Sequence, residues 1–489
     1  MKRQEGKRPN ILWIVTDHHA YYGHEGVKRP NFERLAEQGV LFTNTYCSTP
    51  LCCPSRKSML TGLYACNHGQ INNAVTMAPD SDETYLDALR DSGYDNYYIG
   101  KWHAGGGSPA DLGCHGLFYP GYDNPYHQPE YRRYLAGHGL PPAEMMVEKN
   151  MCEEGWIDEA KEGEIYSFTH DLLNEVISGI LIGPKESHEA FYYARAACEL
   201  LEELKTREED NPFSIRLDLY GPHQPYHPTM EYASLYPPED IRLPVSFRDD
   251  LKSKPEVYQF ETGRGISRNK KLMRPGNVTE DEWKMILSRC YGQITLIDDA
   301  VGRVLRKLEE LQLSHDTVVL WTSDHGDGIA CHGGHTDKSA YMPEEIMRIP
   351  LAIRYPGVLP EGEVCSRLVS NVDLAPTVLA AAGTAFRSPV DGLDLLSLFE
   401  KGGGGWRTAV YAETYGHAFP HVGKMVVEGR IKYVYNQGDL EELYDLEKDP
   451  FEMHNLSPEQ RNRALLEHMR EVCREINPIR KDEILPEAG

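Results

Sequence analysis

Short apolar runs alternate with segments of helical period along most of the chain, and this rhythm constrains the fold more than any other feature. Four of the runs have the composition of strands and lie next to helical stretches: "NILWIVTD" (10–17), "YDNYYIGKWH" (94–103), "FSIRLDLYGPH" (213–223) and "TVVLWTSDHGD" (317–327). Strand, helix and strand in this order are typical of βαβ crossovers, which build a mainly parallel sheet. We therefore predict an α/β fold, with a large mixed, mainly parallel sheet sandwiched by helices, in one domain over residues 1–395.

The C-terminal part of the chain has a different pattern. The stretch "KGGGGW" (401–406) is the clearest linker signal, and three strand-like runs and one helical segment follow it: "TAVYAET" (408–414), "GKMVVEG" (423–429), "RIKYVYN" (430–436) and "SPEQRNRALLEHMREVCREI" (457–476). Hairpin-like strands followed by one helix predict a smaller α+β subdomain over residues 396–489, with an antiparallel sheet. Residues 105–165, rich in Gly, Pro and Tyr, are expected to form an irregular loop near the functional site.

The charge and the cysteines limit the partners and the compartment. The 489 residues include 51 Lys plus Arg against 75 Asp plus Glu, a net charge of −24. A surface of this sign repels nucleic acid and anionic membranes, and no apolar stretch reaches the roughly 18 residues that span a bilayer. The apolar run 11–15 is too short for a signal peptide, and the 11 cysteines lack disulfide-framework spacing. We expect a cytoplasmic protein with reduced thiols and without nucleic-acid or membrane partners.

Ionisable side chains follow all four of these predicted strands: Asp17 and His18, Lys101 and His103, His223, and Asp324 with His325. In a doubly wound sheet, ligands bind beyond the carboxyl ends of the strands. Each group also has a simpler interpretation, because a carboxylate after a strand is often a helix cap and a single His is often a solvated side chain. These interpretations do not explain why all four strand ends carry such groups, so we predict one site.

The residue types indicate the chemistry. Asp17, Asp324 and His325 offer two hard oxygens and one imidazole, a set that suits Ca²⁺, Mn²⁺ or Mg²⁺ better than a thiolate zinc site. Fixed positive charge comes from Arg56, Lys101 and Lys338. A metal with Arg and Lys fits an anionic tetrahedral group such as sulfate or phosphate. His103 and His223 could transfer protons near neutral pH, so the residues predict metal-assisted hydrolysis of a sulfate or phosphate ester.

The segment "CCPSRKSMLTG" (52–62) resembles the signature of the type I sulfatases, Cys-x-Pro-Ser-Arg followed by four residues and Thr-Gly. Other segments resemble the same family in the same order: "NILWIVTDH", "YYIGKWH", "GPHQPYHP", "TSDHGD", "DKSAYMPEEIMRIPL" and "ELYDLEKDPFEMHNL". The resemblance covers residues 9 to 475 or so, nearly the whole chain. It implies the formylglycine-dependent sulfatases of the alkaline phosphatase superfamily.

In this family the signature cysteine is oxidised to formylglycine, an aldehyde that is hydrated in the active site. Counted from Cys52, Pro54 and Arg56 stand at the required positions, whereas counted from Cys53, Ser55 stands where Pro is required. The resemblance therefore implies that Cys52 is the precursor of the nucleophile and that Cys53 is the variable residue. It also implies a partner, the formylglycine-generating enzyme or an equivalent maturase.

The implied mechanism uses the two hydroxyls of the hydrated aldehyde. One attacks sulfur and expels the alcohol, and the other then ejects sulfate from the covalent ester and regenerates the aldehyde. The resemblance assigns His103 as the base of that elimination, and His223 and Lys338 to sulfate binding and leaving-group protonation. It assigns Arg56 and Lys101 to the hydrated aldehyde. The implied metal ligands are Asp17, Asp324, His325 and an oxygen of the modified Cys52. Ca²⁺ is the first choice, with Mn²⁺ and Mg²⁺ as alternatives.

The chain departs from the usual family pattern at three places. His18 stands where many sulfatases carry a second Asp, and His325 stands where many carry Asn. These residues resemble the metal set of phosphonate monoester hydrolases and choline-sulfatase-like members, and whether His18 contacts the metal stays open. The segment "ACHGGHTDK" (330–338) is also unusual, and His332 and His335 either meet substrate or have simple loop roles.

Three functions remain for the structure to separate. The first is hydrolysis of a sulfate monoester of a sugar, aryl or alkyl alcohol, and the second is a phosphonate monoester or phosphodiester hydrolase with the same nucleophile. The third is a catalytically silent sulfatase-like binding protein. We expect loops 105–165 and 225–275 to form the walls of the substrate pocket, so the ester is not set by the sequence. A homo-oligomer is a reasonable expectation for a soluble enzyme.

Overall fold

The computed structural model describes most of the chain: residues 8–21, 26–74, 82–121, 124–151, 160–170, 172–173, 177–208, 211–263, 266–268, 271–273, 277–338, 340–400, 405–417 and 420–476. An eight-stranded sheet forms its centre. Across the sheet the order is β13 (Glu363–Ser370), β2 (Val40–Tyr46), β12 (Leu351–Arg354), β11 (Thr317–Ser323), β1 (Asn10–Asp17), β8 (Phe213–Pro222), β3 (Asp95–Lys101) and β4 (His115–Tyr119). Among these described strands only β12 runs antiparallel to its neighbours. The prediction of a mixed, mainly parallel sheet is confirmed.

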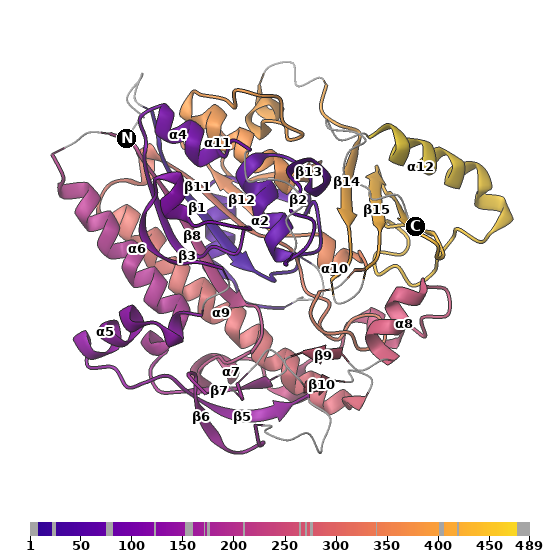
Figure 1. Ribbon diagram of the computed structural model, residues 1–489, viewed down its shortest axis with the longest axis horizontal. Helices are drawn as coiled ribbons and strands as arrows, with labels where there is room; N and C mark the ends of the chain where they lie inside the picture. The colour runs from indigo at the N-terminus through magenta and orange to yellow at the C-terminus, as the bar shows by residue number, and fades with distance from the viewer. Residues whose placement is uncertain are drawn as a thin grey trace.

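Both faces of the sheet are buried under helices, as a continuous apolar strand requires. In β1 the side chains alternate between two hydrophobic cores, with Leu12 and Ile14 in one and Ile11, Trp13 and Val15 in the other. The first core contains helices α1 (Pro30–Glu37), α6 (Glu189–Thr206) and α9 (Glu280–Glu310). The second contains α2 (Cys52–Thr61), α4 (Tyr85–Asp91) and α11 (Leu374–Ala382). Figure 1 shows α6 and α9 running beside the sheet away from α4 and α11.

The four strands that end in predicted site residues are neighbours. They lie in the order β11-β1-β8-β3 at the middle of the sheet and run parallel to one another. Their carboxyl ends therefore meet at one edge. This placement confirms that the ionisable residues after these strands converge, which the sequence alone could only infer.

Residues 105–165 contain regular structure that the sequence analysis did not predict. Besides β4, they form α5 (Pro129–Gly137) and β5 (Glu144–Asn150), while 122–123 and 152–159 lie outside the described residues. Strand β5 is the middle of a three-stranded antiparallel sheet, between β6 (Ile165–Ser167) and β7 (Ile177–Ile182). Expecting only an irregular loop here was wrong, because partners that follow later in the chain stabilise β5.

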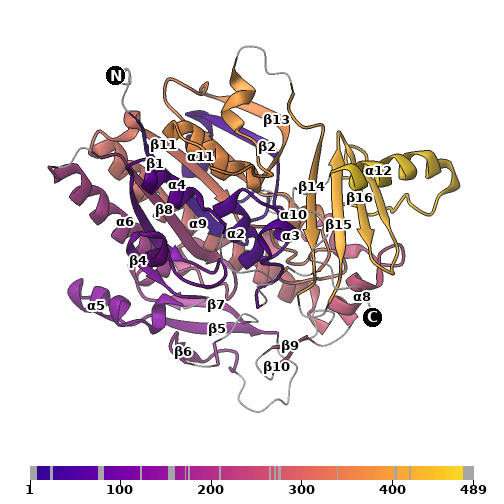
Figure 2. The same cartoon turned by 45° about the horizontal axis from the view of Figure 1, so that its top comes forward.

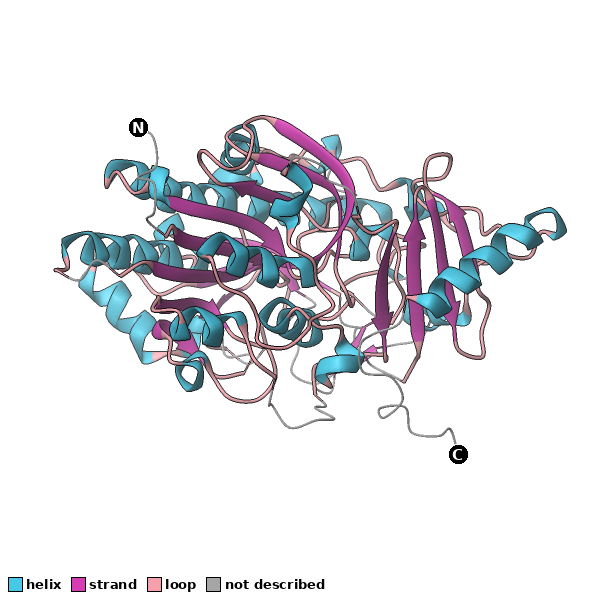
Figure 3. Ribbon diagram, turned by 90° about the horizontal axis from the view of Figure 1, so that it is seen from above, coloured by secondary structure: helices cyan, strands magenta, loops and turns pink. Residues whose placement is uncertain are grey.

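The C-terminal elements form the predicted antiparallel sheet and helix. The strand order is β14 (Ala409–Thr414), β15 (Gly423–Glu428), β16 (Ile431–Asn436) and β17 (Glu442–Asp445). Leu466 and Met469 of α12 (Arg463–Glu475) pack against Val426 and Tyr433, and Figure 3 shows the helix across this sheet. Strand β17 was not predicted. The division at residue 395 stays a prediction, and residues 401–404 of the proposed linker lie outside the described residues.

The remaining helices and strands of the described residues are short. They are α3 (Ala65–His68), α7 (Met230–Ala233), α8 (Glu256–Gly263), α10 (Glu344–Met347), β9 (Ile266–Arg268) and β10 (Lys271–Met273). Figure 2 shows α2, α3 and α10 between the large sheet and β14. Within the described part of the chain, we find no helix with the length and apolar character that crossing a bilayer requires.

Candidate active site

The amino terminus of α2 presents Cys52 to the strand ends. Cys52 is the first residue of the helix and only 1% exposed, and its Sγ lies 3.1 Å from Nε2 of His325, which follows β11. Burial alone would raise the pKa of the Cys52 thiol, but the nearby positive charges, led by Lys338, lower it to about 5. The helix amino terminus also favours negative charge there. Among the cysteines of the described residues, Cys52 is the one whose thiol pKa is lowered rather than raised.

Four side chains form a compact group that could hold a metal. Ligand atoms of Asp17, Cys52, Asp324 and His325 all lie within 4.8 Å of one another, and all four residues are buried. Nδ1 of His325 donates to the carbonyl of Gly326 at 2.8 Å, which leaves Nε2 as the ligand nitrogen. Oδ1 of Asp17 is buried without a hydrogen bond. The oxygen and imidazole donors fit a hard divalent cation.

Arg56 and Lys101 form ion pairs with the carboxylates of this group. Nε of Arg56 donates to Oδ2 of Asp324 at 2.8 Å, and its Nη1 donates to Oδ2 of Asp218 at 2.7 Å. Nη2 of Arg56 is 3.7 Å from Oδ1 of Asp17, while the Lys101 ammonium is paired with Asp17. The two cations therefore orient the carboxylates of Asp17 and Asp324, and their predicted contact with the hydrated aldehyde stays a prediction.

The two carboxylates of the group differ in their affinity for protons. Burial would raise the pKa of Asp17, but Lys101, His223 and Arg56 hold it well below its usual range. Burial and the charge of Asp17 raise the pKa of Asp324 to about 6. A cation between them would keep both ionised, because its charge favours the carboxylate form.

His223 and Lys338 form a second pair beside the first group. Nζ of Lys338 lies 3.3 Å from Nε2 of His223, and Nδ1 of His223 donates to the Gln224 carbonyl at 2.8 Å. Burial and the Lys338 charge lower the pKa of His223 to about 4. Nδ1 therefore carries the ring proton, and Nε2 is the nitrogen that faces Lys338. This pair can bind an anion and relay a proton.

His18 lies between the four-residue group and the His223–Lys338 pair. Its ring stacks on that of His223 with centroids 4.2 Å apart and meets His325 edge-on at 4.5 Å. Its Nε2 is 3.0 Å from Oδ1 of Asp337, and its backbone N–H donates to Oδ1 of Asp324 at 3.2 Å. His18 thus connects the two groups.

His103 follows β3 on the same edge of the sheet. Its backbone N–H donates to the Gly121 carbonyl at 3.1 Å, and its backbone φ is 38°. Burial, followed by the charges of Lys101 and Arg56, keeps the pKa of His103 well below its usual value. A neutral imidazole at neutral pH can accept a proton, as the predicted base must.

His332 and His335 lie in a different cluster. Nδ1 of His332 is 3.0 Å from Oδ2 of Asp249, and its Nε2 is 3.4 Å from Oε2 of Glu345. The His335 ring meets that of Tyr341 edge-on at 4.5 Å. These contacts join the loop before Lys338 to α10 and the loop at 249, which favours loop roles for both residues.

Sequence reasoning did not identify two carboxylates that support the site. Asp218 accepts from Arg56 and, at 2.7 Å, from the hydroxyl of Tyr98, and Asp337 accepts from Nζ of Lys338 at 3.0 Å. Asp218 had a signal in the sequence, because a charged residue inside the apolar run 213–223 needs a buried partner. Asp337 had no comparable signal.

Glu189, at the start of α6, should make the folded state less stable as the pH rises. Burial raises the pKa of its carboxyl to about 8, against 4.5 for the free group. Between these values the folded chain holds a proton that the unfolded chain loses, so stability falls with rising pH. Glu189→Gln should remove this dependence, and urea unfolding should show wild type losing on the order of 3 kcal/mol relative to the variant from about pH 5 to 8.

The matched control for this prediction is Glu202→Gln on the same helix, where the side chain is 54% exposed. That variant should keep the wild-type pH dependence. Equal slopes for wild type and Glu189→Gln would contradict a protonated Glu189.

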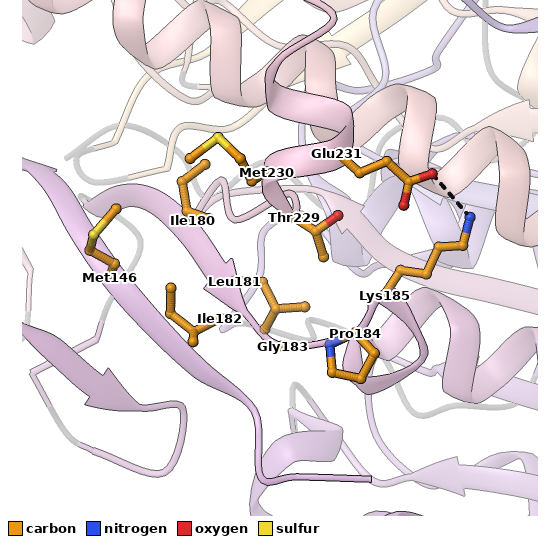
Figure 4. A pocket seen from close by; sticks show the side chains of 10 residues that line it. All are labelled: Met146, Ile180, Leu181, Ile182, Gly183, Pro184, Lys185, Thr229, Met230 and Glu231. Carbon is orange, nitrogen blue, oxygen red and sulfur yellow. Dashed lines mark hydrogen bonds and ion pairs between the residues drawn. The ribbon is translucent and has the colours of Figure 1, made fainter.

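A surface hollow with a volume of about 320 Å³ lies between β7 and α7. Figure 4 shows its apolar lining and the ion pair at its rim, where Nζ of Lys185 is 3.5 Å from Oε1 of Glu231. None of the ten residues that line the hollow is a predicted site residue. The hollow is therefore separate from the candidate active site.

Comparison with known proteins agrees with this geometry. The family model described as Sulfatase matches residues 9–384, and the one described as N-sulphoglucosamine sulphohydrolase, C-terminal, matches residues 332–478. An N-acetylglucosamine-6-O-sulfatase of Bacteroides thetaiotaomicron is 24% identical over 99% of this chain and 90% of its own length. An arylsulfatase of Clostridium perfringens is 27% identical over 95% of this chain and 93% of its own.

Among solved structures, the phosphonate monoester hydrolase of Agrobacterium radiobacter superposes with a TM-score of 0.75 at 23% identity, covering 96% of this chain and 95% of that one. This likeness shows a shared fold. The Sulfatase model covers well over half of the residues, and its match includes the Cys52 segment and all four strand ends. The chain therefore belongs to the sulfatase family.

Proposed function

We propose that the protein hydrolyses sulfate monoesters through a formylglycine nucleophile derived from Cys52, with one divalent cation. The observation that carries the proposal is the position of Cys52 at the helix amino terminus, with its Sγ 3.1 Å from Nε2 of His325. Asp17 and Asp324 complete the group. Sulfatases generally depend on a metal and on formylglycine, and this arrangement provides a place for both.

The cation would be held by Asp17, Asp324, His325 and an oxygen of the modified residue 52. When bound, it would polarise that oxygen and neutralise charge on the sulfate. Ca²⁺ is the first choice, and Mn²⁺ or Mg²⁺ are alternatives because one ligand is an imidazole. A maturase acting on Cys52 is the corresponding partner.

The chain's own residues would divide the remaining work. Lys338 and His223, 3.3 Å apart, would bind the sulfate oxygens and supply a proton to the departing alcohol oxygen. His103, kept neutral by burial, would remove the proton that allows sulfate to leave. Lys101 and Arg56 would fix the carboxylates through the ion pairs described above.

A sulfated saccharide is the substrate class that we favour. The N-acetylglucosamine-6-O-sulfatase that covers nearly the whole chain supports this choice. The runner-up is a phosphonate monoester or phosphodiester hydrolase, supported by the phosphonate monoester hydrolase fold and by the imidazoles of His18 and His325 near the carboxylates. A catalytically silent, sulfatase-like binding protein is the third candidate function.

Steady-state assays separate these functions. Protein produced in a host with the maturase should hydrolyse 4-nitrophenyl sulfate and a 6-sulfated glucosamine with higher kcat/KM than an aryl phosphonate monoester. A larger kcat/KM for the phosphonate would favour the runner-up. Binding of sulfated sugars without turnover of any ester would favour the silent protein.

Removing the metal should affect both turnover and stability. Dialysis against a chelator should lower kcat by at least about tenfold, because charge on the sulfate is no longer neutralised. It should also lower the urea midpoint, since Asp17 and Asp324 then face each other without a cation. Adding back Ca²⁺, Mn²⁺ or Mg²⁺ separately identifies the preferred ion by the size of the recovery.

Asp324→Asn is the matched control for the chelation experiment. It keeps the shape of the site but weakens the metal group, so its urea midpoint should respond little to chelation. Full turnover and an unchanged midpoint in chelated wild type would contradict a metal-dependent site.

A further inference from the structure

A network of buried hydrogen bonds holds the loop that carries His223, and the side chains that make it, those of Gln293, Glu189 and Tyr126, have no part in the proposed chemistry. The loop runs from Gly221, the penultimate residue of β8, to His227. Helices α6 and α9 and the 3₁₀ turn Pro125–His127 pack around it. Because His223 must meet the sulfate and the leaving oxygen, a small shift of this loop moves a reacting group.

Gln293 of α9 is the central residue of the network. It is 1% exposed, its Oε1 accepts from the backbone N–H of His227 at 2.6 Å, and its Nε2 donates to the carbonyl of His223 at 3.4 Å. One amide therefore spans the loop from His223 to His227. A side chain of the same size without the amide would leave both backbone groups without these partners.

The carboxyl of Glu189 holds the other end of the loop. Its Oε1 accepts from the backbone N–H of Gly221 at 3.2 Å, and the residue is 3% exposed. The backbone here lies close to both side chains, because a Cβ at Gly221 would lie 3.1 Å from Nε2 of Gln293 and 3.5 Å from Oε1 of Glu189. The two side chains bracket the backbone before and after His223.

Tyr126 closes the network. Its hydroxyl accepts from the backbone N–H of Glu189 at 3.0 Å and lies 3.0 Å from Nε2 of His227. The His227 ring in turn stacks on His188 with centroids 4.6 Å apart. The loop is thus fixed at Gly221, His223 and His227 by groups that belong to α6, α9 and the turn.

We propose that Gln293 and Glu189 are positioning residues that hold His223 in line with the leaving oxygen of the ester. The inference rests on the proposed function, in which the S–O bond breaks and the alcohol oxygen takes its proton from the His223–Lys338 pair. Loosening the loop would weaken this proton transfer and leave nucleophilic attack intact. The cost should therefore grow as the alcohol becomes a poorer leaving group.

The test compares wild type with Gln293→Met on a series of sulfate esters, from 4-nitrophenyl sulfate through phenyl sulfate to an alkyl sulfate. We expect kcat/KM to fall about 10- to 100-fold on the alkyl ester. On 4-nitrophenyl sulfate, whose leaving group needs little protonation, the loss should stay within about threefold. In a His223→Ala background, Gln293→Met should cause no further loss on the alkyl ester.

The matched control is Thr295→Val, on the same helix. Thr295 also makes two hydrogen bonds, with the Lys28 carbonyl at 2.9 Å and the Tyr236 hydroxyl at 2.6 Å, and neither partner belongs to the 221–227 loop. Thr295→Val should not change the ratio of kcat/KM between 4-nitrophenyl sulfate and the alkyl ester. The proposal would be overturned if Gln293→Met lowered kcat/KM equally on all esters. It would also be overturned if, in the His223→Ala background, Gln293→Met lowered kcat/KM on the alkyl ester by a further factor.

A second pair of variants keeps the test decisive if Gln293→Met does not fold. Glu189→Gln retains an acceptor for the Gly221 N–H and should lose less activity on the alkyl ester than Glu189→Met, which removes it. If both variants showed the same ratio of kcat/KM between 4-nitrophenyl sulfate and the alkyl ester, the role of Glu189 would be overturned. A wild-type protein that hydrolyses none of the esters would instead overturn the proposed function itself.

Discussion

Replacing Cys52 with alanine should abolish ester turnover, with kcat lower by about 10⁴-fold or more. The reason is that residue 52 supplies the nucleophile in the proposed mechanism, in which the remaining groups only bind and polarise the ester. The change itself is small, since Cys52 is buried at the first turn of α2 and alanine fits a helix. Turnover of 4-nitrophenyl sulfate by matched preparations is the measurement.

Cys53→Ala is the control for this experiment. Cys53 is also buried, but burial raises the pKa of its thiol to about 12. Its backbone N–H donates to Oδ1 of Asn73. The variant should keep most of the wild-type turnover. If the two variants lost activity equally, the assignment of the nucleophile by spacing would fail.

Arg56→Met should cause the largest loss of stability, about 3–5 kcal/mol in the free energy of unfolding. Arg56 is 1% exposed and contacts Asp324, Asp218 and Asp17. Methionine preserves the packing of the stem but leaves these buried carboxylates without their shared cation. Urea unfolding measures the change, and turnover should fall with it because the carboxylates of the proposed metal site are no longer oriented.

Arg354→Met tests whether any buried arginine would have the same effect. Arg354 is 6% exposed and donates to Oε1 of Gln38 at 2.9 Å, with no ion pair within 4 Å among the described residues. Its replacement should cost much less stability. An Arg56 variant no less stable than the Arg354 variant would contradict the central role of the Arg56 ion pairs.

The core of the fold could be predicted because each of its central strands is a short apolar run that can be identified from its own sequence. The run "NILWIVTD" is apolar at every position that faces either core, and the helical segments beside it have clear periodicity. Strand β5 could not be predicted in this way. It is stabilised by β6 and β7, and such pairing leaves little trace in a single segment.

The candidate site shows the same division. The strand-end residues were predictable because parallel strands end at one edge, so Asp17 and Asp324 meet although they are far apart in the chain. Contacts between loops were not predictable. The stacking of His18 on His223 and the span of Gln293 across the 221–227 loop depend on three-dimensional packing.

Peptide mass spectrometry over residues 50–60 of active protein tests directly whether Cys52 is the precursor of formylglycine. The predicted result is an aldehyde in place of the thiol at residue 52, an intact thiol at residue 53, and a converted fraction that rises in proportion to kcat. Active protein in which Cys52 is wholly unmodified, or in which the aldehyde lies on Cys53, would contradict the account.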